Sequence, residues 1–194
     1  ELIINTIYHI SNAFFILKFI VTASNIAKGE MLQQLIQSKE PNTKPSVDEY
    51  LKYIRNKTAI LFAAACELGA LHAGQKRIKA LEYWKFGESL GMAFQIRDDL
   101  LDLISNEEAL GKDIGKDYFT DNLTLPYILG YQSLVEQNLI KNQRKLSDFT
   151  KVQKTLEECG AIKSTKEYYQ KYFNEASCNN SNATAVLISR VLAE

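Results

Sequence analysis

The sequence has few of the residues that interrupt helices or form covalent cross-links. Three prolines and nine glycines among 194 residues leave few points at which a helix must end. The three cysteines, Cys66, Cys159 and Cys178, are widely spaced and include no Cys-x-x-Cys pair, which argues against a disulfide framework and against zinc. They fit reduced thiols inside a cell, so we expect an intracellular protein of either the cytoplasm or an organelle.

The sequence also lacks a net charge and a long apolar run. Its 23 basic and 23 acidic residues give a formal charge of zero, so nothing global indicates nucleic acid or an anionic membrane as a partner. The most apolar stretch, residues 13–27, is interrupted by Lys18 and is shorter than the roughly 18 uninterrupted apolar residues that a membrane span needs. We expect no transmembrane segment, and here either a buried helix or a helix at a subunit interface.

What is present is mostly helical periodicity. Apolar residues recur at helical spacing and strand-like alternation is scarce, which predicts an all-α protein with one domain over residues 1–194. Breaks between helices are expected at residues 39–46, 72–77, 105–122, 138–148 and 178–182.

One predicted helix, residues 46–71, has a recognisable start and an unusual composition. Ser46 and Glu49 form the pattern of a capping box. Small residues follow from Ala63 to Ala70, so the helix is thin. A thin helix lets its neighbours approach closely, which favours a place in the middle of a helical bundle.

Three aspartates, Asp98, Asp99 and Asp102, stand in an otherwise apolar run, FQIRDDLLDL. On a helix of about 100° per residue, two of them belong to a stripe about 80° wide, and Asp99 lies just beside it. The members of this stripe are Gly87, Gly91, Gln95, Asp98 and Asp102. We expect the glycines to clear space along this face and the polar side chains to point into it.

Carboxylates held side by side in an apolar setting repel one another and need a cation to persist as anions. Oxygen donors without His or Cys favour Mg²⁺, which keeps positions for water and phosphate. The alternative is a solvated helix edge paired with Arg97 or lysines. Two features favour the metal: the glycine-containing loop GKDIGKD at residues 111–117, and Lys57, a lysine among apolar neighbours that needs an anion.

Four segments together resemble the trans-prenyl diphosphate synthases, the all-α enzymes that build linear isoprenoid diphosphates. FQIRDDLLDL and the following GKDIGKDYFTDNLTLP are similar to the second aspartate-rich motif of that family and its loop. GEMLQ (29–33), KTAILFAAACELGA (57–70) and CGAIKSTKEYYQKYFNEA (159–176) resemble three further family segments in the family's order. The resemblance implies an isoprenoid-synthase-type helical bundle, acting as a homodimer.

The resemblance also implies a metal site and a reaction. Asp98, Asp99 and Asp102 would hold Mg²⁺ against an allylic diphosphate, with Asp98 the strongest candidate for a direct ligand. The reaction would ionise that diphosphate and condense the resulting cation with isopentenyl diphosphate.

Further roles follow from matching positions. Lys57 and Lys112 would bind diphosphate oxygens. Thr58 and Gln95 would lie beside the reacting carbons, with Gln95 also contacting substrate. Asp117 would support substrate binding from outside the direct metal ligands.

The chain departs from the family pattern in two places. Residues 1–93 contain no D-D-x-x-D, whereas family members carry a first aspartate-rich motif in an N-terminal helical block. We therefore expect the chain to be the C-terminal part of a synthase, nearly inactive alone. Asp121 and Asn122 stand where many members have Gly-Lys, so one phosphate-binding lysine is absent, which favours long-chain polyprenyl products.

Three functions remain open from the sequence. The first is a Mg²⁺-dependent prenyltransferase making a linear polyprenyl diphosphate. The second is a non-catalytic partner subunit of a heteromeric synthase. The third is a related cation-forming terpene cyclase, which the joint presence of GKDIGKD and Lys-Thr-Ala disfavours.

Overall fold

The computed structural model describes residues 13–38, 46–104, 115–120, 122–140, 146–178 and 182–192. All regular structure in these ranges is helical, so the predicted all-α class is confirmed. The elements are, in chain order, α2 (Ala13–Gln37), α3 (Val47–Ile54), the π-helical turn η1 (Arg55–Ala59), α4 (Ile60–His72), α5 (Arg77–Ile104), α7 (Lys116–Phe119), α8 (Leu125–Leu129), α9 (Tyr131–Glu136), α10 (Leu146–Glu158), α11 (Ala161–Ser177) and α12 (Asn182–Val191).

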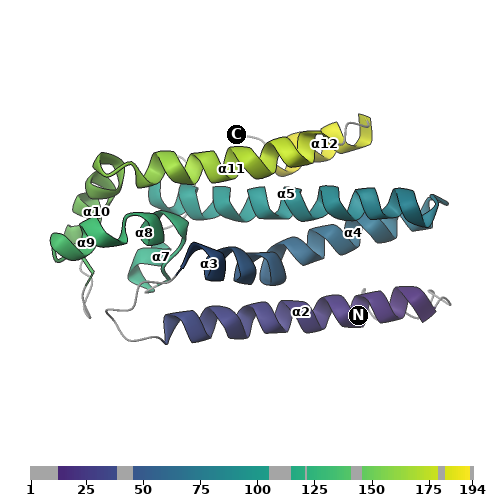
Figure 1. Ribbon diagram of the computed structural model, residues 1–194, viewed down its shortest axis with the longest axis horizontal. Coiled ribbons are helices and arrows are strands. Elements are labelled where there is room, and N and C mark those ends of the chain that lie inside the picture. Colours follow the sequence, from purple (N-terminus) through teal and green to yellow (C-terminus); the bar gives the residue numbers. More distant parts are fainter. Residues whose placement is uncertain are drawn as a thin grey trace.

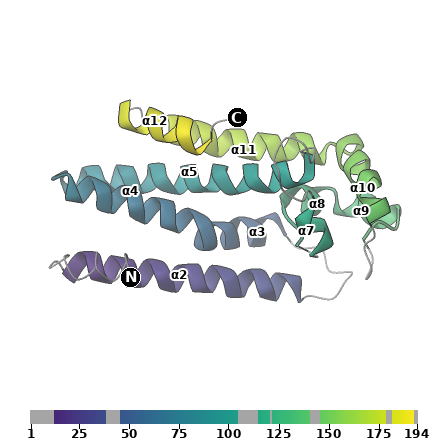
Figure 2. The same ribbon diagram turned by 180° about the vertical axis from the view of Figure 1, so that it is seen from behind.

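The long helices lie side by side in layers (Figure 1). The α3–η1–α4 rod lies between α2 and α5, and α11 with α12 covers the opposite side of α5. The same order is seen from behind, where the short helices α7 to α10 close one end of the bundle (Figure 2). This end contains an apolar cluster that includes Leu103, Tyr118, Phe149 and Leu156.

The rod from α3 to α4 agrees with the helix predicted over residues 46–71. Ser46 Oγ accepts a hydrogen bond from Glu49 N at 3.1 Å, and Ser46 N donates to Glu49 Oε2 at 3.0 Å, so the predicted capping box is present. Ala63 and Ala64 are buried between neighbouring helices, as the small-residue composition predicted. The sequence did not predict the π-helical turn η1, whose wider winding falls on Lys57 and Thr58.

The two glycines of α5 have a different role from the expected one. A Cβ on Gly91 would lie 2.6 Å from Ala59 Cα, and one on Gly87 would lie 2.5 Å from the carbonyl oxygen of Phe62. The glycines therefore allow the backbones of α5 and the α3–α4 rod to touch. The prediction that they clear space for polar side chains is wrong, because the neighbouring backbone fills that space.

Helix α2 contacts the bundle along one narrow line. Its buried residues, Thr22, Gly29 and Ile36, recur at intervals of seven. Lys18, which interrupts the apolar run, pairs with Glu67 at 2.5 Å and lies 3.7 Å from the centroid of the Trp84 ring. The ammonium group of Lys18 thus helps to hold α2 against both α4, through Glu67, and α5, through Trp84.

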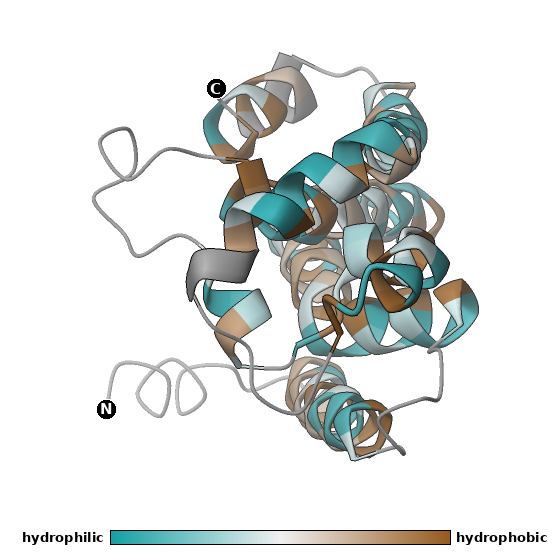
Figure 3. Cartoon of the chain, turned by 90° about the vertical axis from the view of Figure 1, so that its left-hand side faces the viewer, coloured by the Kyte–Doolittle hydropathy of each residue, from teal (hydrophilic) through white to brown (hydrophobic). Residues whose placement is uncertain are grey.

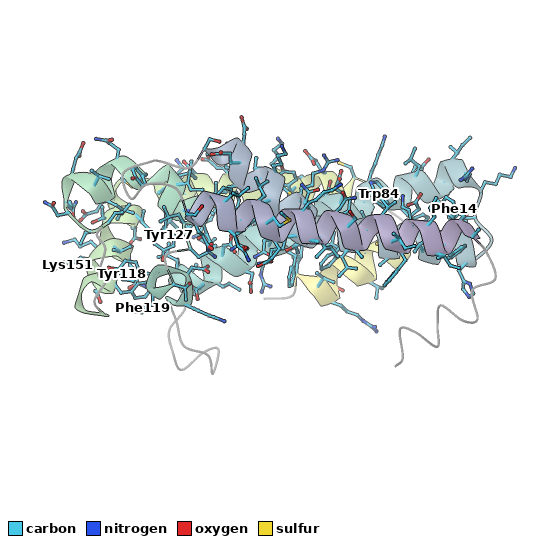
Figure 4. All side chains as sticks on the ribbon, turned by 90° about the horizontal axis from the view of Figure 1, so that it is seen from below. Phe14, Trp84, Tyr118, Phe119, Tyr127 and Lys151 are labelled. Atoms are coloured by element: carbon cyan, nitrogen blue, oxygen red, sulfur yellow. The ribbon has the colours of Figure 1, made fainter. Side chains whose placement is uncertain are left out.

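The rest of α2 faces outward. Seen end-on, the helix lies at the edge of the bundle (Figure 3), and seen from below it lies in front of the other long helices and stops short of the end that α7 to α10 form (Figure 4). Several of its large apolar side chains are exposed: Ile16, Leu17, Phe19, Ile20, Val21, Met31 and Leu35. The buried-helix alternative for residues 13–27 is therefore wrong for this chain, and the interface alternative stays a prediction. None of the helices in the described ranges has the length and apolarity to cross a membrane.

The predicted breaks fall where helices end, with some differences. α4 ends at His72 and α5 begins at Arg77, within the predicted break. α9 ends at Glu136, and α10 begins at Leu146, so its first three residues lie inside the break predicted at 138–148. Gly160, at φ 79°, separates α10 from α11, a turn that the sequence did not predict. Residues 105–114, with Lys112, lie outside the described residues.

Candidate functional site

The candidate site lies where the C-terminal half of α5 meets η1, α3, the end of α2 and the segment around α7 and α8. These elements gather at one end of the bundle (Figure 1). Almost every residue predicted from the sequence to act on substrate or metal lies on them. Their hydrogen bonds form two chains, an inner and an outer one.

The outer chain begins at Lys57. Gly29 of α2 lies so close to the backbone of Lys57 that a Cβ there would overlap the Lys57 nitrogen. This approach brings the next turn of α2 within reach of the lysine. The Lys57 ammonium donates to Gln33 Oε1 at 2.6 Å and pairs with Glu30 Oε2 at 2.8 Å. The anion that the sequence required for Lys57 is, in this structure, the carboxylate of Glu30.

The outer chain continues through Asn122. Its side-chain oxygen accepts from Gln33 Nε2 at 2.9 Å and from Gln37 Nε2 at 3.2 Å, while its Nδ2 donates to Asp117 Oδ1 at 2.7 Å. Asn122 stands where the family pattern led us to expect a lysine. Here it connects α2 to the segment that carries Asp117.

Asp102 ends the outer chain by fixing the start of α7. Its two oxygens accept from the backbone nitrogens of Lys116 at 3.1 Å and Asp117 at 3.0 Å. Gly115, just before α7, has a φ of 72°, a left-handed conformation that glycine adopts readily. Asp102 thereby caps a very short helix and holds Asp117 beside α5.

The inner chain is formed by Thr58, Gln95, Asp99 and Tyr50. Thr58 Oγ1 donates to Gln95 Oε1 at 2.7 Å, and Gln95 Nε2 donates to Asp99 Oδ1 at 2.8 Å. Tyr50 OH donates to Asp99 Oδ2 at 2.6 Å. Asp99 is 5% exposed and Tyr50 is fully buried, so one end of this chain lies in the core, while Gln95 and Thr58 are half-buried.

The aspartates of α5 therefore face different surroundings. Asp98 is exposed, Asp102 is half-buried, and Asp99 points into the core. Asp99, and not Asp98, continues the row of Gly91 and Gln95, whose members are four residues apart and which turns from the solvent toward the rest of the bundle. The stripe predicted from the sequence included Asp98 and left out Asp99, whereas in the structure Asp99 is the aspartate that turns inward.

The carboxylates of the site repel one another. Burial, followed by the charge of Asp117, raises the pKa of Asp99 to about 8, although hydrogen bonds from Tyr50 and Gln95 oppose the rise. Burial also raises the pKa of Asp117 to about 6; the hydrogen bond from Asn122 opposes this, and the charges of Asp102 and Asp98 add to it. Negative charge is therefore in excess at this end of α5.

This excess bears on the predicted metal. Within the described ranges, no group of three or more His, Cys, Asp or Glu side chains could by itself hold a metal ion. The expected cluster of three aspartates is not formed, because Asp99 turns inward. Asp98 and Asp102, one helical turn apart, are still a pair of the kind that Mg²⁺ uses, since it binds through one or two carboxylates together with water and phosphate.

The structure brings Lys57, Thr58, Gln95 and Asp117 to one end of the bundle, as the sequence predicted for a substrate site. Lys112 lies outside the described residues. Sequence reasoning missed the contributions of four residues: Glu30, Gln33, Tyr50 and Asn122. For Glu30 and Gln33 the sequence did contain an indication, because both lie in GEMLQ, a segment that resembles one of the family.

Comparison with known proteins identifies the family of the chain. The profile of the family described as "Polyprenyl synthetase" matches residues 2–162, so the chain belongs to the polyprenyl synthetase family. It is 42% identical over 118 residues to heptaprenyl diphosphate synthase component 2 of Bacillus subtilis, covering 60% of this chain and 32% of that protein. It is 31% identical over 155 residues to geranylgeranyl diphosphate synthase of Methanosarcina mazei, covering 79% of this chain and 47% of that protein.

The fold agrees as well. A polyprenyl synthase from Caulobacter crescentus, whose structure was solved with calcium and isoprenyl diphosphate, superposes with a TM-score of 0.80 at 30% identity. The match covers 93% of this chain and 57% of that one. The recognised family and the isoprenoid-synthase-type fold are thus confirmed. The chain spans only part of the length of these relatives.

Proposed function

We propose that the chain belongs to a Mg²⁺-dependent prenyltransferase that condenses isopentenyl diphosphate with an allylic diphosphate to make a long-chain linear polyprenyl diphosphate. The observation that carries this proposal is the meeting of Lys57, Thr58 and Gln95 with the Asp98–Asp102 pair at one end of α5, in a chain of the polyprenyl synthetase family. Long products are favoured by the absence of a lysine at Asn122 and by relatives described as heptaprenyl and octaprenyl diphosphate synthases.

Recognition of diphosphate would fall to the outer chain. Lys57 is 37% exposed and Glu30 is 49% exposed, so a diphosphate can displace Glu30 as the partner of the ammonium. Lys112 would bind a second set of diphosphate oxygens. Asp117, held by Asn122 and by the turn that Asp102 caps, would support the substrate from behind the direct ligands.

Asp98 and Asp102 are the residues that would hold Mg²⁺. When bound, Mg²⁺ would supply positive charge that stabilises the departing diphosphate. Lys57 adds to that stabilisation from η1, and the apolar walls of the bundle exclude water from the allylic cation. Thr58 and Gln95 would present oxygen atoms beside the cation.

The proposed homodimer would use α2. Its exposed apolar side chains, among them Leu17, Ile20 and Val21, are unusual on a helix that faces water. Sedimentation of the complete protein should give a dimer, and Ile20→Glu should shift it toward the monomer. An unchanged dimer in that variant would place the contact elsewhere.

A second candidate function is a component of a heteromeric synthase. The Bacillus subtilis and Geobacillus stearothermophilus relatives are each described as component 2 of a heptaprenyl diphosphate synthase, a name that implies another component. The exposed face of α2 suits a different partner as well as a second copy. Activity that appears only when another polypeptide is added would identify this case.

The deciding experiment is a condensation assay on the complete protein. Labelled isopentenyl diphosphate and an allylic diphosphate should give a polyprenyl diphosphate with Mg²⁺ and none with a chelator. Separation of the products by chain length then tests the long-chain proposal. Absence of condensation, with or without a partner polypeptide, would overturn the proposed function.

A further inference from the structure

The inner chain contains two residues to which the proposed reaction gives no role beyond metal binding or packing. Tyr50 comes from α3 and Asp99 from α5, and they join at 2.6 Å in the core. Tyr50 is fully buried and Asp99 is 5% exposed. Burying a carboxylate costs free energy, because desolvation disfavours its charged form, and hydrogen bonds are needed to offset that cost.

The two oxygens of Asp99 are both engaged by protein. Oδ2 accepts from Tyr50, and Oδ1 accepts from Gln95 Nε2 at 2.8 Å. A metal ion would have to reach a group that is only 5% exposed and would have to displace one of these hydrogen bonds. Its sequence neighbour Asp98 is exposed and requires no such rearrangement.

The hydrogen bonds of the inner chain run in one direction. Gln95 Nε2 donates to Asp99 Oδ1, and Gln95 Oε1 faces Thr58. The hydroxyl of Thr58 must then donate to Oε1, which uses its only hydrogen. What remains on the Thr58 oxygen is its lone pairs.

We propose that Tyr50 and Asp99 are positioning residues that fix the orientation of the Gln95 amide and, through it, of the Thr58 hydroxyl, and that Asp99 is not a metal ligand. This inference rests on the proposed prenyl transfer. An oriented pair of oxygen atoms beside a developing allylic cation stabilises it without reorganising during the reaction. A flipped amide would instead point an N–H dipole toward Thr58 and reverse that effect.

Two substitutions should each allow the side-chain amide of Gln95 to flip, for different reasons. Asp99→Asn introduces an NH₂ group that can donate to Gln95, so both amide orientations become available. Tyr50→Phe removes the hydrogen bond that holds Asp99 Oδ2, so the carboxyl group can rotate and no longer fixes the Gln95 amide. Tyr53→Phe is the matched control, because Tyr53 is a buried tyrosine on the same helix whose ring packs edge-on against Tyr50 at 5.3 Å.

The kinetic test compares these variants in the complete protein. We expect Tyr50→Phe and Asp99→Asn each to lower kcat by about 10- to 100-fold, with the KM for both diphosphates and the Mg²⁺ concentration for half-maximal rate unchanged. Tyr53→Phe should keep the wild-type kcat. In a Gln95→Leu background, Tyr50→Phe should cost nothing further. If Asp99→Asn instead raises the Mg²⁺ requirement while Tyr50→Phe does not, Asp99 is a metal ligand and the proposal fails.

A second measurement does not depend on activity. With ¹⁵N-labelled glutamine, the side-chain NH₂ signal of Gln95, identified by its loss in Gln95→Leu, should be protected from exchange in wild type and in Tyr53→Phe. It should shift and lose protection in Asp99→Asn and Tyr50→Phe. Wild-type protein without condensation activity would refute the proposed function, whereas an unchanged Gln95 signal in both variants would refute the positioning role.

Discussion

The inner and outer hydrogen-bond chains of the site differ in what surrounds them. The inner chain ends in the core at Tyr50 and Asp99, of which Asp99 is 5% exposed, and its other members, Gln95 and Thr58, are half-buried. All members of the outer chain are partly exposed to solvent, and Lys57 is 37% exposed. Asp98 and Asp99 are consecutive residues of one helix, yet they face these two environments.

This difference separates two tasks. Buried hydrogen bonds cannot be exchanged for water without cost, so the Tyr50–Asp99 bond holds Asp99, and through it Gln95, in one orientation. Exposed pairs such as Lys57 with Glu30 contribute little to stability and exchange partners easily. The outer chain therefore suits ligand recognition, and the inner chain suits orientation.

The largest effect is expected from removing the exposed aspartate. Asp98→Ala should lower condensation activity by about a thousandfold, equivalent to about 4 kcal/mol, because Mg²⁺ loses a ligand on the accessible side of α5. Steady-state assays across Mg²⁺ concentrations measure this, and circular dichroism should show unchanged helix content. Asp48→Ala, at another exposed aspartate, is the control. Wild-type turnover in Asp98→Ala would exclude the assigned metal role.

The next effect concerns the ammonium group of the outer chain. Lys57→Met should raise the KM for the allylic diphosphate by about a hundredfold, since a charged contact to phosphate is lost, while unfolding free energy changes by less than about 1 kcal/mol. Lys52→Met, at an exposed lysine one turn earlier, should leave KM unchanged. A large loss of stability with an unaltered KM would make Lys57 a structural residue.

The close contact behind the inner chain gives a stability effect. Gly91→Ala should lower the unfolding free energy by about 1–3 kcal/mol, because the added methyl meets Ala59 Cα at 2.6 Å. Gly69→Ala, where a Cβ meets nothing within 4 Å, should instead stabilise by about 0.5–1 kcal/mol. Urea unfolding measures both. Equal effects of the two substitutions would contradict the backbone contact.

The inner chain should also give stability a pH dependence. Burial raises the pKa of Asp99 to about 8, above the value of about 3.9 expected for an unfolded aspartate, so the folded protein binds more protons between these values. The stability that Asp99 contributes is therefore present below about pH 4 and lost as pH rises toward 8. Wild type should lose unfolding free energy relative to Asp99→Asn between pH 5 and about 8 in urea titrations. A constant difference between the two proteins would show that Asp99 titrates normally.

The smallest effect is expected from Asn122, in the outer chain. Asn122→Ala removes the link between α2 and Asp117 and should cost about 0.5–1.5 kcal/mol, as expected for hydrogen bonds that are partly exposed. Hydrogen exchange should speed up in the last turn of α2. Gln170→Ala, an exposed residue of α11, should leave that turn as it is. Unchanged exchange in Asn122→Ala would mean that the buried residues Thr22, Gly29 and Ile36 are enough to hold α2 in place.

The sequence predicted the site unevenly, for identifiable reasons. Lys57, Thr58, Gln95 and Asp117 were predicted to act at one site, because each stands in a segment whose residue pattern is distinctive, and they do lie at the same end of the bundle. Their roles stay predictions. Tyr50 was missed because its partner, Asp99, is 49 residues away. Gln33 and Asn122 were missed for the same reason, with 89 residues between them.

What the sequence determined by itself was the all-α class, the start of the helix at Ser46 and the segments whose pattern marks the family, since all of these depend on residues close together in the chain. What only the tertiary structure decided was which aspartate turns inward. Asp98 and Asp99 differ by a rotation of about 100° on α5. The contact of Gly87 and Gly91 with the α3–α4 rod fixes that rotation, and a sequence pattern about 80° wide cannot resolve it.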